Sequence, residues 1–435
     1  MALDTSRIAP IDVDPVEAAD DIKLSPRRRR RIVPPLKPWW IRTHRWASLT
    51  LGLVLLVEVV SGAILLMQPE VMRWGYPDRY QSTASADPLT AIEALEVVQR
   101  EVPDLQAQYV RTFRDVWLVS GDSAVTGRDE SAFVDPGTGA INAVAVQSPW
   151  IMRALVNLHD CAFSCEGYPL YMAWTQEHVP GFSEEITWAA LILGSLGVLL
   201  IFLCLSGLVI WWPTIRRFAT GFQFRRGRGA YVRDLDLHKL VGIIAIPLLL
   251  MWGVSGASFE FQWVQKAYYA LLPGSDPGEP EPVEPGTGPL LSVRDAQAVA
   301  LALHPQGRVV GVYETTPTEP GGSYGFSLRE GFDAYKDSYY QGQVYVEVDS
   351  HGGGTTDYPK SDGPITEQYW QNWQYGLHFG SIVPWAPRLI GVLFGLTPVL
   401  LALTGITVWL TKRRSKRNRA HRARLEASLA VDSSP

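Results

Sequence analysis

Four long apolar runs divide the chain. They cover Trp46–Met67, Ile186–Trp212, Leu240–Phe259 and Leu389–Leu410, each with about 20 or more residues. A helix of that length crosses a hydrocarbon core about 30 Å thick. One carboxylate, Glu58, lies well inside a run. The pattern therefore predicts four membrane-spanning helices rather than four buried helices of a soluble protein.

The first and third runs share two markers and the spacing between them. "HRWASLTLGLVLLVEVVSG" extends from His44 to Gly62, and "HKLVGIIAIPLLLMWGVSG" extends from His238 to Gly256, a separation of eighteen residues in both. The second and fourth runs also correspond, "LSGLVIWWP" with "LTGITVWLT". We therefore predict a tandem duplication, with equivalent groups around a pseudo-twofold axis along the membrane normal.

Two long polar segments separate the runs, and each predicts a small α+β domain. In the first, "DPLTAIEALEVVQREVPD" has helical spacing, while "YVRTFRDVWLVSG" and "SAFVDPGTGAINAVA" read as strands with turns. In the second, "LLSVRDAQAVALALHPQGRVVGVYE" predicts a helix and a strand, and "YGFSLRE" and "QVYVEVDSHGGGTTD" supply further strands. The predicted fold is thus a membrane α-helical protein of four spanning helices in which each half carries an external α+β domain.

The predicted organisation follows from these runs and their ends. It comprises a cytoplasmic basic segment (1–40), a spanning helix (41–68), an external domain (69–150), an external segment with a Leu-His step and a cysteine pair (151–185), a second spanning helix (186–213), a cytoplasmic loop (214–236), a third spanning helix (237–260), a second external domain with a Pro-rich linker at 273–289 (261–372), an external Leu-His segment with the fourth helix (373–411), and a cytoplasmic basic tail (412–435).

Basic residues predict which side each segment occupies. "RRRRR" precedes the first run, "RRFATGFQFRRGRGAYVR" joins the second and third, and "KRRSKRNRAHRAR" follows the fourth. Residues 68–185 instead hold seven Arg, no Lys and seventeen acidic residues. Because positive residues stay on the cytoplasmic side, both termini are expected inside. The basic runs are placed to meet anionic membrane lipid, and the net charge of −5 gives no indication of nucleic-acid binding.

Four of the eight histidines stand at equivalent positions. His44 and His238 begin equivalent helices on the cytoplasmic side, whereas His159 and His378 each follow a leucine on the external side. One pair near each membrane face suits two bis-imidazole haems, because two neutral imidazoles give a low-spin iron that transfers electrons. No C-x-x-C-H sequence occurs, so such haems would be non-covalent. Arg388 is a candidate partner for a haem propionate.

The external ligand in the first half has two interpretations. His178 lies 29 residues before Gly207, and His378 lies 27 before Gly405, so spacing alone would pair His178 with His378. The Leu-His context instead favours His159. Another external histidine, His304 in "LHPQG", is expected to be a solvated loop residue.

Cys161 and Cys165 lie in "HDCAFSCEGY" on the predicted external side, where oxidation is permitted. We expect a local disulfide between them, and a metal site that also uses His159 is the alternative. Cys204, inside an apolar run, is expected to be inert packing.

Glu58 has no counterpart in the repeat, where Trp252 stands at the equivalent position. An ionisable side chain in a membrane run favours a proton relay or a carboxylate of a haem pocket. A hydrogen-bonded structural glutamate is the alternative.

The sequence does not define an external binding pocket. A cluster of aromatic residues in the second external domain offers the candidates for one, although strands rich in tyrosine more often simply pack: Tyr335, Tyr339, Tyr340 and Trp370.

Over about residues 38–412 the chain resembles the PepSY-associated transmembrane proteins, also called iron-regulated membrane proteins. The resemblance rests on "HRWASLTLGL", the Leu-His step at His159, "LSGLVIWWP", "LHKLVGIIAI", "GLHFG" and "LTGITVWL", and "FVDPGTGAI" resembles the strand and turn of a PepSY domain. The segment Cys161–Cys165 departs from the simpler form of the pattern.

The resemblance implies a four-helix bundle in the bacterial cytoplasmic membrane with two extracytoplasmic PepSY-like domains. It also implies two b haems, with the ligand role carried to His44, His238, His159 and His378. The implied activity is reduction of an external Fe(III)-siderophore, which releases iron as Fe(II). No nucleotide or flavin motif occurs, so an unidentified cytoplasmic reductase or a membrane quinol must supply electrons. The alternative is a non-enzymatic, membrane-anchored PepSY protein that binds a peptidase or a signalling partner.

Overall fold

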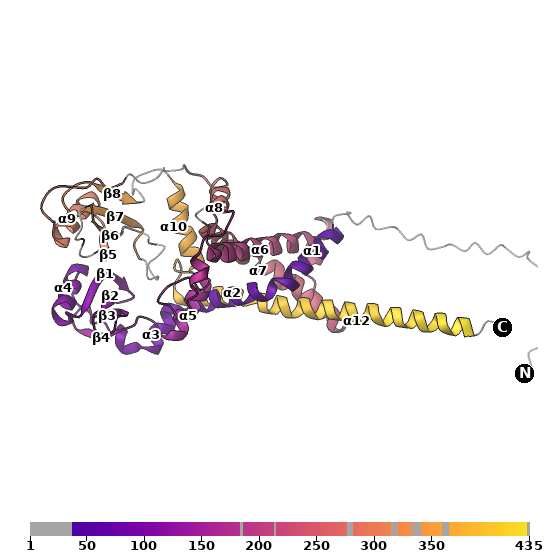
Figure 1. Ribbon diagram of the computed structural model, residues 1–435. Coiled ribbons are helices and arrows are strands. Elements are labelled where there is room, and N and C mark those ends of the chain that lie inside the picture. Colours follow the sequence, from indigo (N-terminus) through magenta and orange to yellow (C-terminus); the bar gives the residue numbers. More distant parts are fainter. Residues whose placement is uncertain are drawn as a thin grey trace, which may run out of the picture.

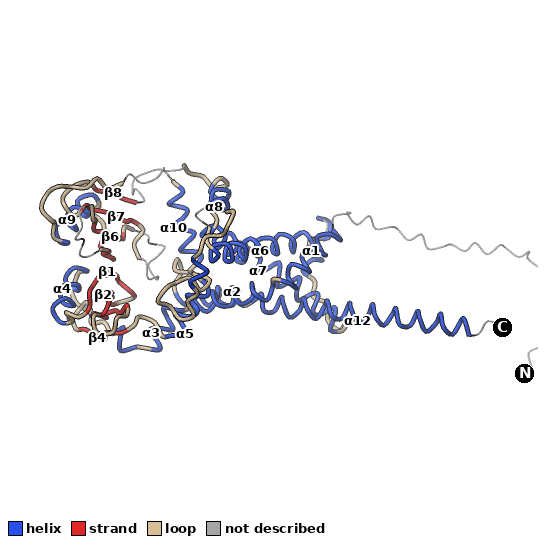
Figure 2. Tube along the Cα trace, viewed as in Figure 1, coloured by secondary structure: helices blue, strands red, loops and turns tan. Residues whose placement is uncertain are grey.

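A computed structural model describes residues 37–182, 186–212, 215–275, 282–314, 317, 321–331, 333, 341–358 and 365–432. The basic run Arg27–Arg31 and part of the 273–289 linker lie outside these residues. The strands gather in a domain at one end of the molecule, and the long helices form a bundle beside it (Figure 1). The C-terminal helix projects from the bundle on the side away from the strands (Figure 2).

Three helices among the described residues are long and apolar enough to cross a membrane. They are α6 (Trp188–Trp211), α7 (Ala230–Glu260) and the helix that continues from α11 (Trp385–Gly395) into α12 (Thr397–Asp432). A fourth span results if α1 (Lys37–Thr50) and α2 (Gly52–Leu65), which are bent by 68° at their junction, are counted as one.

The long helices extend beyond the apolar runs. α7 begins at Ala230, so His238 lies two turns inside the helix and does not begin it. The first two turns of α7, which are polar, are stabilised by Asp236. Its carboxylate is almost fully buried and accepts hydrogen bonds from the guanidinium and the backbone N–H of Arg225. Apolar length marks only the part of a helix suited to hydrocarbon, whereas backbone hydrogen bonding continues for as long as the ends are stabilised.

Small residues allow α6 and α7 to pack closely. A Cβ on Gly197 would lie 2.7 Å from the backbone nitrogen of Ala257, and one on Gly194 would lie 2.6 Å from the ring of Phe261. Close backbone approach of this kind stabilises helix pairs where neighbouring lipid is as apolar as the side chains. On the outside, Leu53 and Leu393 are exposed, as expected of surfaces that face lipid.

The two segments expected to be external share one antiparallel sheet of eight strands in the order β4-β3-β2-β1-β5-β6-β7-β8. The strands are β1 (Leu105–Phe113), β2 (Val116–Ser123), β3 (Asp129–Val134), β4 (Ile141–Ala145), β5 (Arg308–Tyr313), β6 (Ser323–Arg329), β7 (Val344–Asp349) and β8 (Thr355–Tyr358). The two sets of four join where β1 pairs with β5, with Tyr109 opposite Tyr313. Sequence alone did not indicate that the two external segments join in this way.

One face of the sheet is covered by α4 (Ala91–Glu101) and α9 (Val293–Leu303). Thr90 and Glu93 form a capping box at the start of α4, which fixes where that helix begins. The buried side chains of both helices pack against alternate strand residues in one apolar core that runs across the β1–β5 junction.

Short helices connect the sheet to the bundle. They are α3 (Gln68–Gly75), α5 (Trp150–His159), α8 (Gln262–Tyr269) and α10 (Glu367–His378), with 3₁₀ turns at Pro77–Tyr80 and Ala173–Gln176. A further 3₁₀ segment, Ile215–Phe222, lies between α6 and α7. Two of the connecting helices, α5 and α10, end at histidines singled out by the sequence.

Candidate functional site

The structure brings His159 and His378 together at the end of the bundle nearest the sheet. Their ring centroids lie 6.3 Å apart, with the ring planes inclined by 37°. The Nδ1 of His159 lies 3.1 Å from the Ser61 hydroxyl on α2, and the Nδ1 of His378 lies 2.7 Å from the Ser255 hydroxyl on α7. His178 is exposed, and its backbone pairs with Thr187. The geometry thus favours His159 over His178 as the partner of His378.

His44 and His238 make equivalent hydroxyl contacts at the part of the bundle farther from the sheet. The Nδ1 of His44 lies 2.7 Å from the Ser206 hydroxyl on α6. The Nδ1 of His238 lies 3.1 Å from the Thr404 hydroxyl on α12 and 3.0 Å from the carbonyl oxygen of Leu401. All four imidazoles therefore bind a hydroxyl on another helix through the same ring nitrogen.

A glycine follows each of these hydroxyl residues and lies against the ring. A Cβ added to Gly62 would lie 2.5 Å from Cε1 of His159, and a Cβ on Gly405 would lie 3.3 Å from Cε1 of His238. The corresponding distances are 3.6 Å from Gly207 to His44 and 3.7 Å from Gly256 to His378. The Ser-Gly or Thr-Gly step of each apolar run thus contacts a histidine from elsewhere in the chain. We call this arrangement, with a hydroxyl at Nδ1 and a glycine beside the ring, a histidine seat.

The hydroxyl groups also fix the tautomer of each ring. The Ser61, Ser206, Ser255 and Thr404 hydroxyls each donate to a backbone carbonyl three or four residues earlier in their own helix. A hydroxyl has one hydrogen, so its contact with imidazole must accept a hydrogen bond from Nδ1–H. In the neutral imidazole, the lone pair of each of these four histidines then resides on Nε2, and none of their Nε2 atoms takes part in a hydrogen bond within the described residues.

This donor set fits an iron porphyrin. Nδ1–H held by a second group and Nε2 directed to the metal is the usual arrangement of a metal-binding histidine. Two imidazoles on one metal, with metal–nitrogen bonds of about 2.0–2.1 Å, have ring centroids roughly 6 Å apart, and the His159–His378 rings lie 6.3 Å apart. The glycines leave the space that the imidazole rings themselves occupy between the helices.

Glu58 sets the external pair apart from the internal one. One carboxylate oxygen of Glu58 lies 3.0 Å from Nδ1 of His159, and the backbone carbonyl oxygen of Glu58 accepts a hydrogen bond from the same nitrogen at 2.9 Å. Burial lowers the pKa of His159, but the hydrogen bond and charge of Glu58 more than offset this, so the pKa is raised. Burial, together with the charge of His159, lowers the pKa of His378 to about 3.

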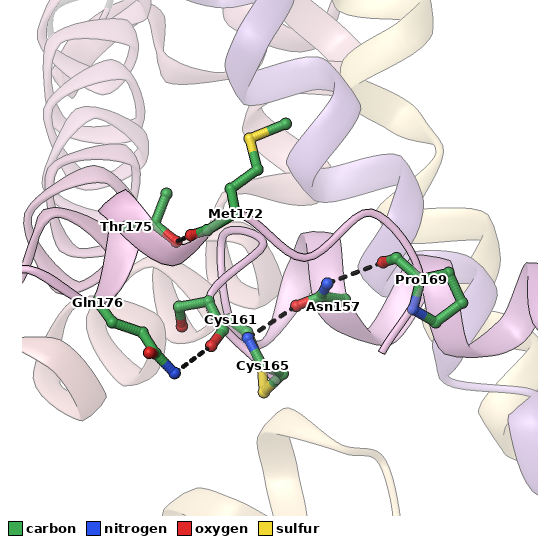
Figure 3. Close-up of a disulfide and its surroundings, with 8 residues drawn as sticks. Asn157, Cys161, Cys165, Pro169, Met172, Thr175 and Gln176 are labelled. Atoms are coloured by element: carbon green, nitrogen blue, oxygen red, sulfur yellow. Dashed lines mark hydrogen bonds between the residues drawn. A yellow bond between two sulfur atoms is a disulfide. The ribbon is translucent and has the colours of Figure 1, made fainter. Parts of the chain in front are cut away.

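Cys161 and Cys165 form a disulfide just after His159 (Figure 3). The side chain of Asn157 accepts from the backbone N–H of Cys165 at 3.0 Å and donates to the carbonyl of Pro169 at 2.8 Å, which ties the loop to α5. Within the described residues, no group of three or more His, Cys, Asp or Glu side chains is arranged to hold a metal ion, so nothing there supports the alternative metal site. Cys204 is buried in the bundle core.

His304 differs from the expectation of a solvated residue. It is buried, with Nδ1 3.1 Å from a carboxylate oxygen of Glu330 and Nε2 3.3 Å from one of Asp357. The residue caps α9 at the edge of the sheet core, where a strand from the far end of the sheet covers it. Its sequence context, "LHPQG", showed the turn but not the carboxylates that the sheet brings from β8.

Arg388 is buried among oxygen atoms. Its guanidinium donates to the carboxylate of Glu70 at 3.1 Å and to the carbonyls of Gly380, Leu66 and Val383. The expected propionate role of Arg388 stays a prediction. In the structure its contacts join α3 and α11 at the outer end of the bundle.

Between α5, α10 and the sheet face opposite α4 and α9 lies a cavity of about 600 Å³. Part of the same face is covered by an apolar cluster that includes Met72, Tyr80 and Phe133. The cavity is lined by tyrosines, arginines, amides and hydroxyls from both external segments and from the helix ends, which sequence reasoning missed. Of the aromatic residues expected to face a ligand, Tyr335, Tyr339 and Tyr340 lie outside the described residues, and Trp370 donates to the carbonyl of Pro273. Strand alternation was the available signal: Tyr313 and Tyr345 follow core valines on β5 and β7.

Comparison with known proteins gives two matches. The model of the family described as the PepSY-associated transmembrane region matches residues 41–412. An uncharacterized protein of Pseudomonas aeruginosa is 41% identical over 64 residues, which is 14% of this chain and 15% of that relative. The match therefore spans a small part of the length of that relative.

Proposed function

Because this chain belongs to the PepSY-associated transmembrane family, we propose that it is a dihaem reductase of the bacterial cytoplasmic membrane. It passes electrons outward and reduces an external ferric siderophore, so that iron is released as Fe(II). Both termini lie in the cytoplasm, and the strands and the His159–His378 pair lie outside.

One observation carries the proposal: the same histidine seat occurs four times. In each, an imidazole donates through Nδ1–H to a hydroxyl whose own hydrogen is already used, and a glycine lies beside the ring. A structural histidine needs only a hydrogen-bond partner, whereas a ligand also needs its other nitrogen unprotonated. Four such seats in two pairs support two bis-imidazole sites.

The repetition also supports a tandem duplication with four spanning segments. Ser61-Gly62 on α2 is equivalent to Ser255-Gly256 on α7, and Ser206-Gly207 on α6 is equivalent to Thr404-Gly405 on α12. The sheet supports the same proposal, since four strands on one side of the β1–β5 junction answer four on the other. The bent pair α1–α2 then forms the first span.

In this mechanism the histidines hold the cofactor and the hydroxyl groups keep Nε2 unprotonated. Two b haems, when bound, supply one-electron carriers at two depths of the membrane. Glu58 places a carboxylate beside His159. Fe(II) is bound less tightly than Fe(III) by hard anionic oxygens, so one-electron reduction of a siderophore loosens its iron. The donor is an unidentified cytoplasmic reductase or membrane quinol.

Haem quantitation of the purified full-length protein tests the proposal. We expect about two b haems per chain, with sharp low-spin α and β bands after dithionite. His44→Ala or His238→Ala should each remove about one haem, and His159→Ala or His378→Ala about the other. His304→Ala, which removes a buried histidine outside the bundle, is the matched control and should keep both.

The reaction itself is measured by mixing the dithionite-reduced protein with a ferric siderophore and following Fe(II) with a chromogenic chelator. Protein from haem-replete cells that contains no haem would overturn the proposal and favour the alternative, a membrane-anchored PepSY protein that binds a peptidase or signalling partner. Haem-loaded protein that no ferric chelate oxidises would remove the assigned substrate.

A further inference from the structure

Resting on the proposed function, we propose that the 600 Å³ cavity under the sheet binds the electron acceptor, and that its walls select a compact ferric chelate with aromatic, anionic oxygen ligands. The cavity lies between the sheet face opposite α4 and α9, the helices α5 and α10, and the ends of α2 and α11 nearest the sheet. A cavity of this volume suits one ligand of drug-like size.

Its floor adjoins the external histidine pair. On α5, Val156 and Asp160 line the cavity, three residues before and one residue after His159. On α10, Tyr375 and Phe379 line it at the same two offsets from His378. Positions at these offsets share the helix face next to that of the histidine, so both helices present a histidine to the bundle and the adjacent face to the cavity.

The roof is aromatic because the strands alternate. Val312 of β5 and Val344 and Val346 of β7 point into the apolar core, so Tyr313 and Tyr345 point to the cavity. Their ring centroids lie 6.0 Å apart. A Cβ on Gly325 would collide with the Tyr345 side chain, so glycine at that position lets the ring lie across the neighbouring strand. Ring faces of this kind stack on planar aromatic ligands.

Guanidinium groups give one side of the cavity its charge. Arg111 on β1 is nearly buried, donates to the amide of Gln147 at 2.9 Å and lies 5.0 Å over the ring of Tyr109. Arg153 on α5 lies 5.0 Å over the ring of Tyr168. Both side chains line the cavity, so two cations lie beside aromatic rings in a partly desolvated space. This combination recognises an aryl oxyanion better than a cationic chelate.

Two carboxylates also line the cavity and limit the charge that it accepts. Asp129 lies on the side of Arg111 and Arg153, and Asp160 lies on the floor. With Arg388 already bound to Glu70, the two remaining arginines and the two aspartates cancel, which favours a ligand of low charge over a highly charged one. A hexadentate complex with two phenolates and a single negative charge has both the size and the charge required.

Gallium(III) complexes test binding apart from electron transfer, because Ga(III) has the charge of Fe(III) and is not reduced. The probes are Ga(III) bound to N,N′-bis(2-hydroxybenzyl)ethylenediamine-N,N′-diacetate, which is a monoanion with two phenolates, and Ga(III)–EDTA, a monoanion without rings. Ga(III)–desferrioxamine B is the cationic hydroxamate. Binding to full-length haem-loaded protein is measured by calorimetry, and we expect the phenolate complex to bind at least tenfold more tightly than the other two.

Variants locate the site. Tyr345→Ala and Arg153→Gln should each weaken binding of the phenolate complex by fivefold or more, whereas Tyr345→Phe should retain most of it because the ring face is kept. Tyr369→Ala on the exposed side of α10 and Arg100→Gln on α4, across the sheet, are the matched controls and should bind as the wild type. None of these changes should alter the haem content or the reduced spectrum.

Equal affinity for the three complexes would overturn the selectivity, and unchanged affinity in both cavity variants would overturn the site. Loss of haem in Tyr345→Ala and Arg153→Gln together would show that the cavity serves the cofactor and not an acceptor. These results are separate from the failure of the proposed function, which would appear as haem-free protein or as reduced protein that ferric chelates do not oxidise.

Discussion

The external histidine pair, His159 and His378, and the internal pair, His44 and His238, have the same local contacts but different neighbouring groups. Each ring of both pairs has a hydroxyl on Nδ1 and a glycine beside it. In the internal pair, His44 and His238, a backbone carbonyl is added as a second partner of His238 alone. Around the external pair a carboxylate, Glu58, is added on one side only. Under the proposed haem ligation, the shared hydroxyl and glycine would orient each ligand, and the added carboxylate would tune one site relative to the other.

The two halves of the chain also differ in how tightly the seat is built. At the external pair, the Cβ position of Gly62 lies 2.5 Å from His159, whereas that of Gly256 lies 3.7 Å from His378. The first distance is too short for any side chain, and the second is an ordinary van der Waals contact. Equivalent glycines therefore carry unequal constraints, and substitution can break the symmetry of the two halves.

The largest expected effect comes from adding one methyl group at these glycines. Gly62→Ala should displace the His159 ring and lower the haem content from two to about one per chain, because the external site loses an axial ligand. Gly256→Ala should keep two haems. The measurement is the ratio of pyridine haemochrome to protein. Equal haem in both variants would mean that the two seats are equally tolerant and that the comparison fails.

A second comparison concerns equivalent turns in the two halves of the sheet. After β3, Asp135 accepts from the backbone N–H groups of Thr83 and Gly137 at 2.9 and 2.8 Å. At the end of β7, Asp349 accepts from the N–H groups of Gly286, His351 and Gly353. Both carboxylates hold a turn against a preceding loop, and both are buried.

These carboxylates make the stability of the sheet depend on pH. Burial raises the pKa of Asp135, but the hydrogen bonds from Thr83 and Gly137 outweigh it and lower the pKa from 3.8 to about 2. The pKa of Asp349 is lowered in the same way. A folded-state pKa below the unfolded value stabilises the fold above about pH 4, and that contribution is lost as the pH falls through about 2.

Asp135→Asn should therefore destabilise the sheet at neutral pH by about 2 kcal/mol, and Asp349→Asn should act in the same direction. The measurement is thermal unfolding followed by near-ultraviolet circular dichroism between pH 7 and about pH 2. The difference between wild type and variant should shrink as the pH falls. Asp87→Asn, at an exposed loop position, is the control. A constant difference across this range would exclude a titrating carboxylate as the cause.

The sequence predicted the parts of the site that recur along the chain. Spacing between histidine and Ser-Gly was visible because both markers flank one apolar run. What it did not show is that His238 binds Thr404 whereas Ser255, in the same run as His238, binds His378. A repeat shows which positions are equivalent, but contacts between helices depend on packing that no local pattern records.

The cavity shows a second limit of sequence analysis. The aromatic wall of the cavity forms only if β5 pairs with β1. This pairing brings Tyr313 and Arg111, which are 202 residues apart in the sequence, onto one face of one sheet. Pairing between the edge strands of two distant segments depends on which edges the rest of the fold leaves unpaired. Alternation within a strand fixes only which face of the sheet each side chain lies on. The face was predictable, whereas the junction was not.

The smallest expected effect isolates the charge of Glu58. Its carboxylate beside Nδ1 of His159 draws the proton away from the ring and makes Nε2 a stronger donor, which stabilises Fe(III) over Fe(II). Glu58→Gln should raise the midpoint potential of the external haem by tens of millivolts, on a scale where about 59 mV is a tenfold change in the equilibrium. A redox titration followed in the α band measures it.

The internal pair is the control within the same molecule, because its partners are hydroxyl and carbonyl oxygens without charge. Glu58→Asp keeps the charge and should shift the external potential less than Glu58→Gln. If Glu58 instead served only to hold the loop after α5, Glu58→Gln would lower the thermal stability and leave both potentials in place. A shift confined to the external site would show that the carboxylate makes the two haems unequal, and an external site of lower potential is the better reductant for a ferric chelate.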